Sequence, residues 1–247
     1  MDEKFIKGIK IDWNRVGKNS YSRKIPSIQS ISQLYFNNNI TFFVGENGTG
    51  KSTLLESIAV AYGFNPEGGN MSFNFSTMDT HSELYKAITV VKGISRPKSN
   101  FFLRAESFYN VASKIEDYRD GDDYDSYYKS YGGKSMHEQS HGESFLALIQ
   151  NRFNAKGLYI LDEPEAALSP QRQLTLLMLI YNLAQKGAQF IIASHSPILL
   201  GIPDAYILSF DDEKIREITY EETESYKITE LFINNRQLLL NHMLKNK

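Results

Sequence analysis

The chain has 247 residues, of which 41% are hydrophobic, and its 27 basic and 29 acidic residues give a net charge of −2. This balance excludes a global electrostatic attraction to nucleic acid or anionic membrane, and the length permits one large core or two small ones. With no cysteine, no signal-like start and no apolar run of the about 18 residues that cross a membrane, the sequence predicts a cytoplasmic protein without disulfides or membrane insertion.

Strand-like and helix-like segments alternate along the chain, which predicts an α/β fold with a mainly parallel sheet covered by helices. The expected elements of the first half are a strand at 5–11, a polar excursion at 15–26, a strand at 40–44, a helix at 53–61, and strands at 87–92 and 100–104. No clean linker divides the chain, so residues 1–247 are expected to form a single domain.

The middle of the chain is read as an insertion at 106–140. Its tyrosine-rich, acidic part at 116–133 has too few aliphatic residues for a core of its own and is expected to be a mobile surface loop. The expected elements of the second half are a strand at 157–161, a helix at 170–185, a strand at 189–193, a short helix from 197, a strand at 205–210 and a helix at 228–244. The apolar side chains of the last helix are expected to pack on the sheet, with a protein partner as the alternative.

A glycine-rich loop lies between the strand at 40–44 and the helix that follows it. It fits the phosphate-binding pattern GxxxxGK[ST] with Gly45, Glu46, Asn47, Gly48, Thr49, Gly50, Lys51 and Ser52, and Thr53 follows. The glycines let successive N–H groups converge on a phosphate at the helix N-terminus, Lys51 reaches the β- and γ-phosphates, and Ser52 offers a hydroxyl to Mg²⁺. Thr53 is expected to cap the helix or contact the α-phosphate. The sequence therefore predicts binding of a nucleoside triphosphate.

Two carboxylates end the apolar strand at 157–161. Successive strand residues point to opposite sides, so Asp162 and Glu163 are expected to differ in role. Asp162 suits a Mg²⁺ position beside Ser52, whereas Glu163 is placed to act as general base toward a water at the γ-phosphate, and Pro164 ends the strand. The alternative is an acidic strand end that merely caps the next turn.

At this point the residues resemble the ABC-type ATPases in the broad sense, which include transporter motors, SMC proteins and recombination-repair ATPases. Ser140, His141, Gly142 and Glu143 are similar to part of that family's LSGGQ signature, in which the serine and the second glycine are kept. In the family this motif starts a helix and binds the γ-phosphate of a nucleotide held by a second subunit. The resemblance therefore implies composite sites in an ATP-induced head-to-tail homodimer.

Other landmarks of the family follow in the same order. Residues 165–169 resemble the D-loop, with Ser169 where transporters have aspartate, and His195 resembles the switch histidine that contacts the γ-phosphate and holds the attacking water with Glu163. The place of the Q-loop glutamine offers Glu106, which the resemblance makes a candidate metal ligand. Trp13 or Tyr21 fits the position of the aromatic residue that stacks on adenine.

The resemblance also covers architecture and reaction. A compact, stand-alone group of predicted bacterial ATPases, without the coiled-coil arms of SMC and repair proteins, shares the phrases VGENGxGKSTLLE, FFLRAESF, HEQSHGESF, LDEPEAALSPQRQ and ASHSPIL. Similarity to this group implies a P-loop NTPase fold of ABC-ATPase type, in which a mainly parallel sheet flanked by helices carries an antiparallel β portion and a small helical insertion. It implies Mg²⁺-dependent ATP hydrolysis and leaves the biological purpose open.

Three alternatives to an ATP-hydrolysing machine remain at this stage. His137 and His141 fit the HExxH pattern of zinc peptidases, with Glu163 as third ligand, although Gly142 and the glycines upstream are expected to interrupt the required helix. The second is a switch that dimerises on ATP and turns over slowly. The third is a kinase, which the pair Asp162 and Glu163 with His195 disfavours because it points to water as acceptor.

The sequence leaves the partner open between a protein and DNA. Basic residues are dispersed, and their nearest approach to a cluster is Arg15, Lys18, Arg23 and Lys24. This arrangement gives weak support to DNA binding. A protein partner is equally compatible with the tyrosine-rich loop or with the last helix.

Overall fold

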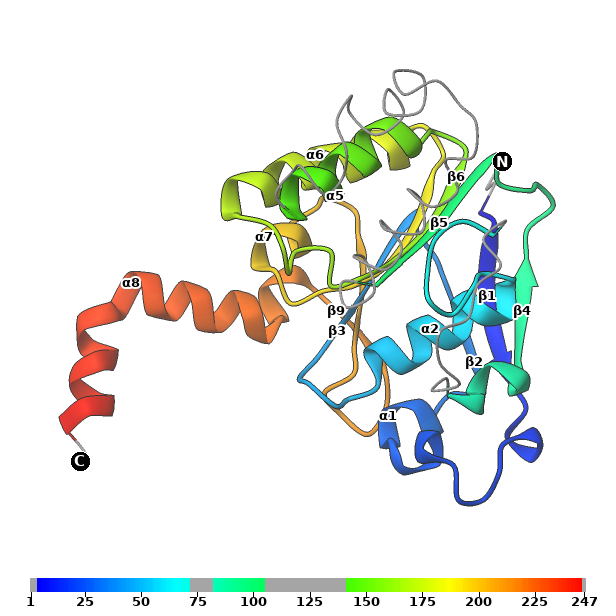
Figure 1. The fold of residues 1–247 in the computed structure, drawn as a ribbon. Helices are drawn as coiled ribbons and strands as arrows, with labels where there is room; N and C mark the ends of the chain where they lie inside the picture. The colour runs from blue at the N-terminus through cyan, green and yellow to red at the C-terminus, as the bar shows by residue number, and fades with distance from the viewer. Residues whose placement is uncertain (1–3, 72–81, 105–140, 246–247) are drawn as a thin grey trace.

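The computed structural model describes residues 4–71, 82–104 and 141–245, which form two sheets and the helices that cover them (Figure 1). The strands are β1 (Ile6–Ile11), β2 (Gln33–Tyr35), β3 (Ile40–Val44), β4 (Ile88–Lys92), β5 (Ser99–Arg104), β6 (Gly157–Asp162), β7 (Gln189–Ala193), β8 (Tyr206–Ser209) and β9 (Arg216–Ile218). The α-helices are α1 (Pro26–Gln29), α2 (Lys51–Tyr62), α5 (His141–Arg152), α6 (Pro170–Gln185), α7 (Pro197–Leu200) and α8 (Glu224–Lys245). The insertion expected at 106–140 lies outside the described residues.

The central sheet has six strands in the order β5-β6-β7-β3-β8-β9. All neighbouring pairs are parallel except β8 and β9, so the α/β fold with a mainly parallel sheet is confirmed. The register places Phe43 beside Ala193, Ala193 beside Asp162, and Asp162 beside Arg104. Four strands therefore end along one edge of the sheet, which brings together the loops that follow them.

Alternate residues of the central strands enter two separate cores. Phe42 and Ile192 pack with α5, α6 and α7 on one face, whereas Phe43, Ile160 and Ile191 pack with α2 on the other. Each of these side chains is fully buried. Because both faces are covered, the strands read as continuous apolar runs and are held firmly up to their ends. Figure 1 shows the helices on the two sides of the sheet.

A second sheet of three antiparallel strands, in the order β2-β1-β4, packs on the face that carries α2. The buried side chain of Gln189, at the start of β7, joins the two sheets. Its Oε1 accepts hydrogen bonds from the backbone N–H groups of Phe5 and Ile6, each at 2.9 Å, and its Nε2 donates to the Ile6 carbonyl at 2.7 Å. The expected antiparallel β portion is thus confirmed, and it is fixed to the central sheet.

Helix α8 departs from the expectation that its apolar side chains pack on the sheet. It projects from the body of the molecule (orange to red in Figure 1), and Ile233 and Leu238 are 70% and 71% exposed. At Asn235 the backbone leaves the helical region (φ −129°, ψ 28°), which coincides with a bend in the helix. The expectation was wrong because the amphipathic pattern gives the apolar face of a helix but not a surface to cover it.

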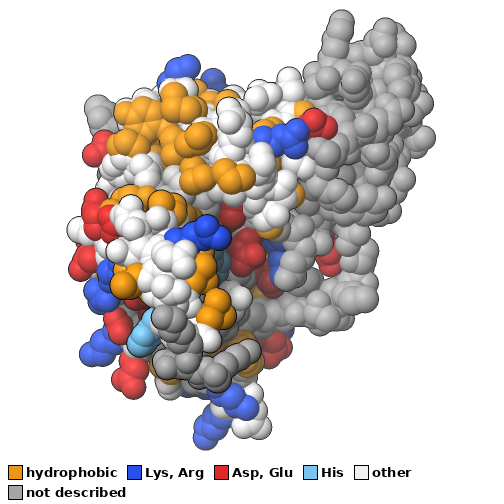
Figure 2. All heavy atoms as spheres, turned by 90° about the vertical axis from the view of Figure 1, so that its left-hand side faces the viewer, with side chains coloured by type: hydrophobic (Ala, Val, Ile, Leu, Met, Phe, Trp, Pro, Cys, Tyr) orange, Lys and Arg blue, Asp and Glu red, His pale blue; other side chains and the backbone are white. Residues whose placement is uncertain are grey.

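Figure 2 views the molecule from the side on which α8 projects, and hydrophobic side chains gather in patches on this face. The exposed apolar residues of α6 are Leu174 and Met178, and those of α8 are Ile228, Leu231, Phe232, Ile233, Leu238, Met243 and Leu244. Within the described residues, no helix has both the length and the apolar character needed to cross a membrane.

Candidate functional site

The glycine-rich loop joins the buried strand β3 to the first turn of α2. Gly50 is the N-cap of α2 and has a left-handed backbone (φ 95°), and a Cβ atom there would lie 2.6 Å from Ile28 Cδ1. Glycine is therefore required at this position by both conformation and space. The Ser27 hydroxyl, which donates to the Thr49 carbonyl at 2.6 Å, holds the loop against α1.

Lys51 lies over this loop. Its Nζ donates hydrogen bonds to the carbonyls of Gly45 and Glu46 at 2.6 and 2.8 Å, and the residue is only 4% exposed. Burial lowers the pKa of Lys51 from its ordinary value, and the nearby carboxylates of Glu163, Asp211 and Asp162 act against this shift. The carbonyl oxygens of the loop thus hold the Lys51 ammonium beside the loop, where its positive charge can attract a phosphate oxygen.

Ser52 and Asp162 meet at the edge of the sheet. The Ser52 hydroxyl donates to Asp162 Oδ1 at 2.9 Å, and Asp162 is 9% exposed at the end of β6. A hydroxyl and a carboxylate held together beside a phosphate loop form the oxygen donor set that Mg²⁺ prefers. The residues present thus fit a magnesium–nucleotide complex. Glu106, the other expected metal ligand, lies outside the described residues.

Glu163 and His195 face each other across the ends of β6 and β7. Glu163 does not continue the strand as expected, because its backbone turns left-handed (φ 48°) immediately before Pro164. A non-glycine residue in this conformation is strained, and such strain is concentrated at functional sites. His195 Nε2 lies 3.9 Å from Glu163 Oε1 and is buried without a hydrogen-bond partner among the described residues. The hydrogen-bonding capacity of His195 Nε2 is therefore unused in this conformation.

Two polar features of this edge were missed by sequence reasoning. Asp211, just beyond β8, accepts a hydrogen bond from the Glu46 N–H at 2.7 Å and so holds the phosphate loop. Arg104, at the end of β5, pairs with Glu56 of α2 at 3.0 Å. Asp211 follows a predicted strand and Arg104 ends one, so the argument from strand ends that selected Asp162 applies to both.

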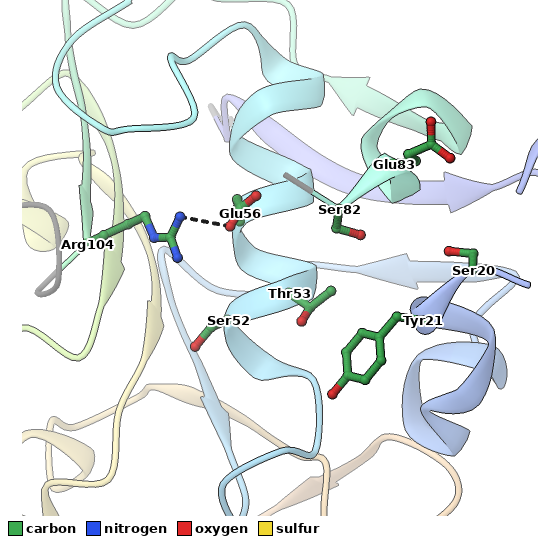
Figure 3. Close-up of a pocket in the computed structure, with 8 residues that line it drawn as sticks. All are labelled: Ser20, Tyr21, Ser52, Thr53, Glu56, Ser82, Glu83 and Arg104. Atoms are coloured by element: carbon green, nitrogen blue, oxygen red, sulfur yellow. Dashed lines mark ion pairs between the residues drawn. The ribbon is translucent and has the colours of Figure 1, made fainter. Parts of the chain in front are cut away.

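A pocket of about 490 Å³ lies beside the start of α2 (Figure 3). Its lining residues are Ser20, Tyr21, Ser52, Thr53, Glu56, Ser82, Glu83 and Arg104. The Arg104–Glu56 pair comes from one side and Tyr21, which is 63% exposed, from the other. Trp13 instead donates its indole N–H to the Ile31 carbonyl at 2.8 Å and packs on a core. Of the two aromatic candidates, only Tyr21 lines this pocket.

Helix α5 begins with the residues that resemble the signature motif. His141, Gly142 and Glu143 form its first turn, whereas Ser140 lies outside the described residues. The helix that the zinc-peptidase alternative requires, at 137–141, lies outside the described residues except for His141, and Gly142 stands in the first turn of α5. A Cβ atom on it would lie 2.6 Å from the Ala167 carbonyl oxygen, so glycine allows close packing there, and Glu143 pairs with Arg172 at 2.7 Å.

The zinc-peptidase alternative depends on His137 and Glu138, which lie outside the described residues. Within the residues that the structure describes, no group of three or more histidine, cysteine, aspartate or glutamate side chains is placed to hold a metal ion. His141 and Glu163, both described, belong to different elements, α5 and the end of β6.

Comparison with known proteins finds one matching family model and several similar solved structures. Residues 128–201 match the family model described as "AAA domain, putative AbiEii toxin, Type IV TA system". The solved structure of cbiO1 from Clostridium perfringens, part of the ABC transporter complex cbiONQ, has 18% identity and a TM-score of 0.48, with 98% of this chain and 100% of that chain covered. The SMC head domain from Thermotoga maritima has 13% identity and a TM-score of 0.41, with coverages of 87% and 98%. No curated protein matches the chain.

The glycine-rich loop joins a central strand of a mainly parallel sheet to a helix, which is the arrangement of P-loop proteins. The match to the AAA model includes β6 and β7. Strand β7 pairs with β3, which precedes the glycine-rich loop, and β6 pairs with β7. The structure thus has the strand, glycine-rich loop and helix of P-loop proteins, and residues 128–201 are similar to the AAA family model.

Proposed function

We propose that this protein binds ATP and hydrolyses it with Mg²⁺, at composite sites formed when two copies associate head to tail on binding ATP. The observation that carries the proposal is the convergence of Lys51, Ser52, Asp162, Glu163 and His195 at one edge of the central sheet. These groups come from the ends of three adjacent strands, which are held on both faces by buried cores.

Binding rests on the loop from Gly45 to Ser52, with Thr53 in the same turn of α2. The backbone N–H groups of the loop and the N-terminus of α2 attract an anion, and Lys51 supplies the balancing charge. Bound Mg²⁺ would neutralise charge on the phosphate oxygens, with Ser52 and Asp162 as its protein ligands and Glu106 as the additional candidate. Tyr21 is the residue proposed to cover the nucleobase, because it faces Thr53 across the pocket.

Catalysis is assigned to Glu163 with His195. An oxygen about 2.8 Å from each group is compatible with the 3.9 Å between Glu163 Oε1 and His195 Nε2. A water held in this way donates one proton toward the carboxylate, which is what a general base requires. The imidazole keeps the water in place after a rotation of its side chain exposes Nε2, which is buried in this structure without a hydrogen-bond partner among the described residues.

The second copy is assigned the residues at the start of α5, namely Ser140, His141, Gly142 and Glu143. Gly142 packs on Ala167 and Leu168, which follow β6, and not on the phosphate loop of its own chain. This packing supports action on a nucleotide held by another copy, where the N–H groups of the first turn of α5 attract a phosphate. The whole chain is proposed to act as one domain in this assembly.

The test uses Glu163→Gln, which keeps the size of the side chain and removes its basicity. We expect unchanged ATP binding, hydrolysis slower by about 100-fold or more, and accumulation of a dimer in ATP by light scattering. The control is Glu213→Gln, which makes the same change on an exposed residue in the turn after β8.

Each possible failure is informative. Hydrolysis at the normal rate by Glu163→Gln would remove Glu163 from the role of base, and a monomer at saturating ATP would reject the composite site. Dimerisation of the unaltered protein in ATP with turnover too slow to measure would favour the alternative of a nucleotide-dependent switch.

A further inference from the structure

Glu165, two residues beyond the proposed base, links the segment after β6 to the segment after β7. Its Oε1 accepts three hydrogen bonds: from the Ser194 hydroxyl at 2.8 Å, the His195 N–H at 2.6 Å and the Ser196 N–H at 3.1 Å. The His195 N–H follows a strand end and would otherwise need another partner, whereas the Ser196 N–H also donates to the Ser194 Oγ at 3.1 Å. A single carboxylate oxygen thus fixes three successive residues.

The link lies where the sheet itself no longer holds the two segments together. The bond from the Glu163 N–H to the Ala193 carbonyl, at 2.9 Å, follows the last paired residues of β6 and β7. Beyond it the chain turns at Pro164, and Glu165 continues the connection through its side chain. Hydrogen bonds to an ionised acceptor are stronger than those between neutral groups.

The segment held by Glu165 is also anchored on its far side. The Ser196 hydroxyl donates to Gln173 Oε1 of α6 at 2.6 Å and accepts from the N–H groups of Ile198 and Leu199, which begin α7. His195 therefore lies between an anchor on α6 and α7 and the carboxylate of Glu165. With its backbone fixed at both neighbours, the imidazole retains only the rotations of its own side chain.

We propose that Glu165 is a positioning residue that directs the His195 imidazole toward Glu163. The effect of Glu165 on hydrolysis rests on the proposed function, whereas its effect on the orientation of the His195 ring does not. The observed approach of His195 Nε2 to Glu163 Oε1, 3.9 Å, is the geometry that Glu165 maintains. Its second oxygen, Oε2, is buried without a hydrogen-bond partner among the described residues, so the clamp depends on Oε1.

The first test observes the ring directly, by NMR of the histidine side chains in the full chain without nucleotide. The sequence has 5 histidines, and His195→Ala assigns the signal of interest by its loss. We expect Glu165→Ala to shift or split the His195 ring signals, because the ring samples more than one orientation. Glu165→Gln keeps an acceptor oxygen for the same donors and should largely restore the native signals.

The second test measures hydrolysis. Glu165→Ala should lower kcat by about 10- to 100-fold, with KM for ATP changed by less than about 3-fold, as expected when a supporting contact is lost. In a His195→Ala background, the same change should lower kcat little further, because the two residues act as one unit. Ser194→Ala, which removes one of the three donors, should have the smaller effect.

The two tests separate the failure of this inference from that of the proposed function. Unchanged His195 signals in Glu165→Ala, or equal losses of kcat with and without His195, would overturn the positioning role. Altered signals in Glu165→Ala together with normal hydrolysis by His195→Ala would instead keep the positioning role and reject the catalytic one. Glu213→Ala, on an exposed turn, controls for the loss of a carboxylate.

Discussion

The carboxyl edge of the central sheet and helix α8 depart from ordinary folding preferences in opposite directions. At the edge, ionisable groups are withdrawn from water, with Lys51 4% and Asp162 9% exposed. On α8, apolar groups face water, with Ile233 and Leu238 70% and 71% exposed. Both arrangements cost free energy, the first by desolvation of charge and the second by loss of burial.

The difference lies in what surrounds the two regions. The edge is braced by a buried core on each face of the sheet, so its strained and partnerless groups hold their positions. Every residue of α8 from Glu230 to Leu238 is exposed, so the body of the molecule does not constrain it there. Substitutions near the edge should therefore alter the whole protein, whereas those on the projecting helix should alter only the helix.

The largest difference in the free energy of unfolding is expected between substitutions of two phenylalanines. Phe190 of β7 is fully buried, with its ring 5.0 Å from that of Tyr159, whereas Phe232 of α8 is 44% exposed. We expect Phe190→Ala to lower the free energy of unfolding by about 3–5 kcal/mol, because it leaves a cavity in the core beside the central sheet. Phe232→Ala should lower it by less than about 1 kcal/mol. Urea unfolding followed by circular dichroism measures both.

Equal losses from the two substitutions would contradict the comparison, since they would mean that α8 is packed in solution. If Phe190→Ala yields no folded protein, Phe190→Leu provides the milder change. It should still cost about 1 kcal/mol, because the replacement keeps most of the volume.

A smaller effect on stability, with the opposite sign, is expected at Lys51. Because burial lowers its pKa below the ordinary 10.5, the unfolded chain binds more protons than the folded chain between the two pKa values. The stability of the unaltered protein should therefore rise with pH through that window. Lys51→Met removes this dependence and should leave stability at neutral pH unchanged or higher.

The ATP affinity of Lys51→Met should fall by about 100-fold, the equivalent of about 3 kcal/mol in lost charged hydrogen bonds.

Titration of a fluorescent ATP analogue and urea unfolding at several pH values measure these effects. Lys186→Met, on an exposed lysine that follows α6 at the opposite end of the sheet, is the matched control and should change neither. Unaltered ATP affinity in Lys51→Met would show that the glycine-rich loop does not hold the phosphates.

The parts of the fold that sequence reasoning predicted are those in which local pattern and burial agree. The strands β3, β6 and β7 are largely apolar runs buried on both faces. The residues after them were selected by the phosphate-loop pattern, by the two carboxylates that end a strand and by the family resemblance. The edge strands β2 and β9 were missed. Each has three residues and is mostly exposed, so it carries neither an apolar run nor a clear alternation.

The supporting residues of the site were missed for another reason. Asp211 and Glu165 accept hydrogen bonds from the backbone of segments distant in sequence, at Glu46 and at 194–196. Every residue type except proline carries a backbone N–H, so no residue type or spacing in the partner segment marks such a contact. The identity of Lys51, Ser52 and Asp162 was predictable because their side chains themselves carry the chemistry.

The smallest change in the free energy of unfolding is expected for a substitution on α8. Ile233→Ser removes an apolar side chain that is already 70% exposed, so little burial is lost. The free energy of unfolding should change by less than about 0.5 kcal/mol, and ATP affinity should not change. Leu55→Ser, at a fully buried position of α2, is the contrasting control. A loss of more than about 2 kcal/mol from Ile233→Ser would require this helix to be covered in solution, because only a buried side chain contributes that much.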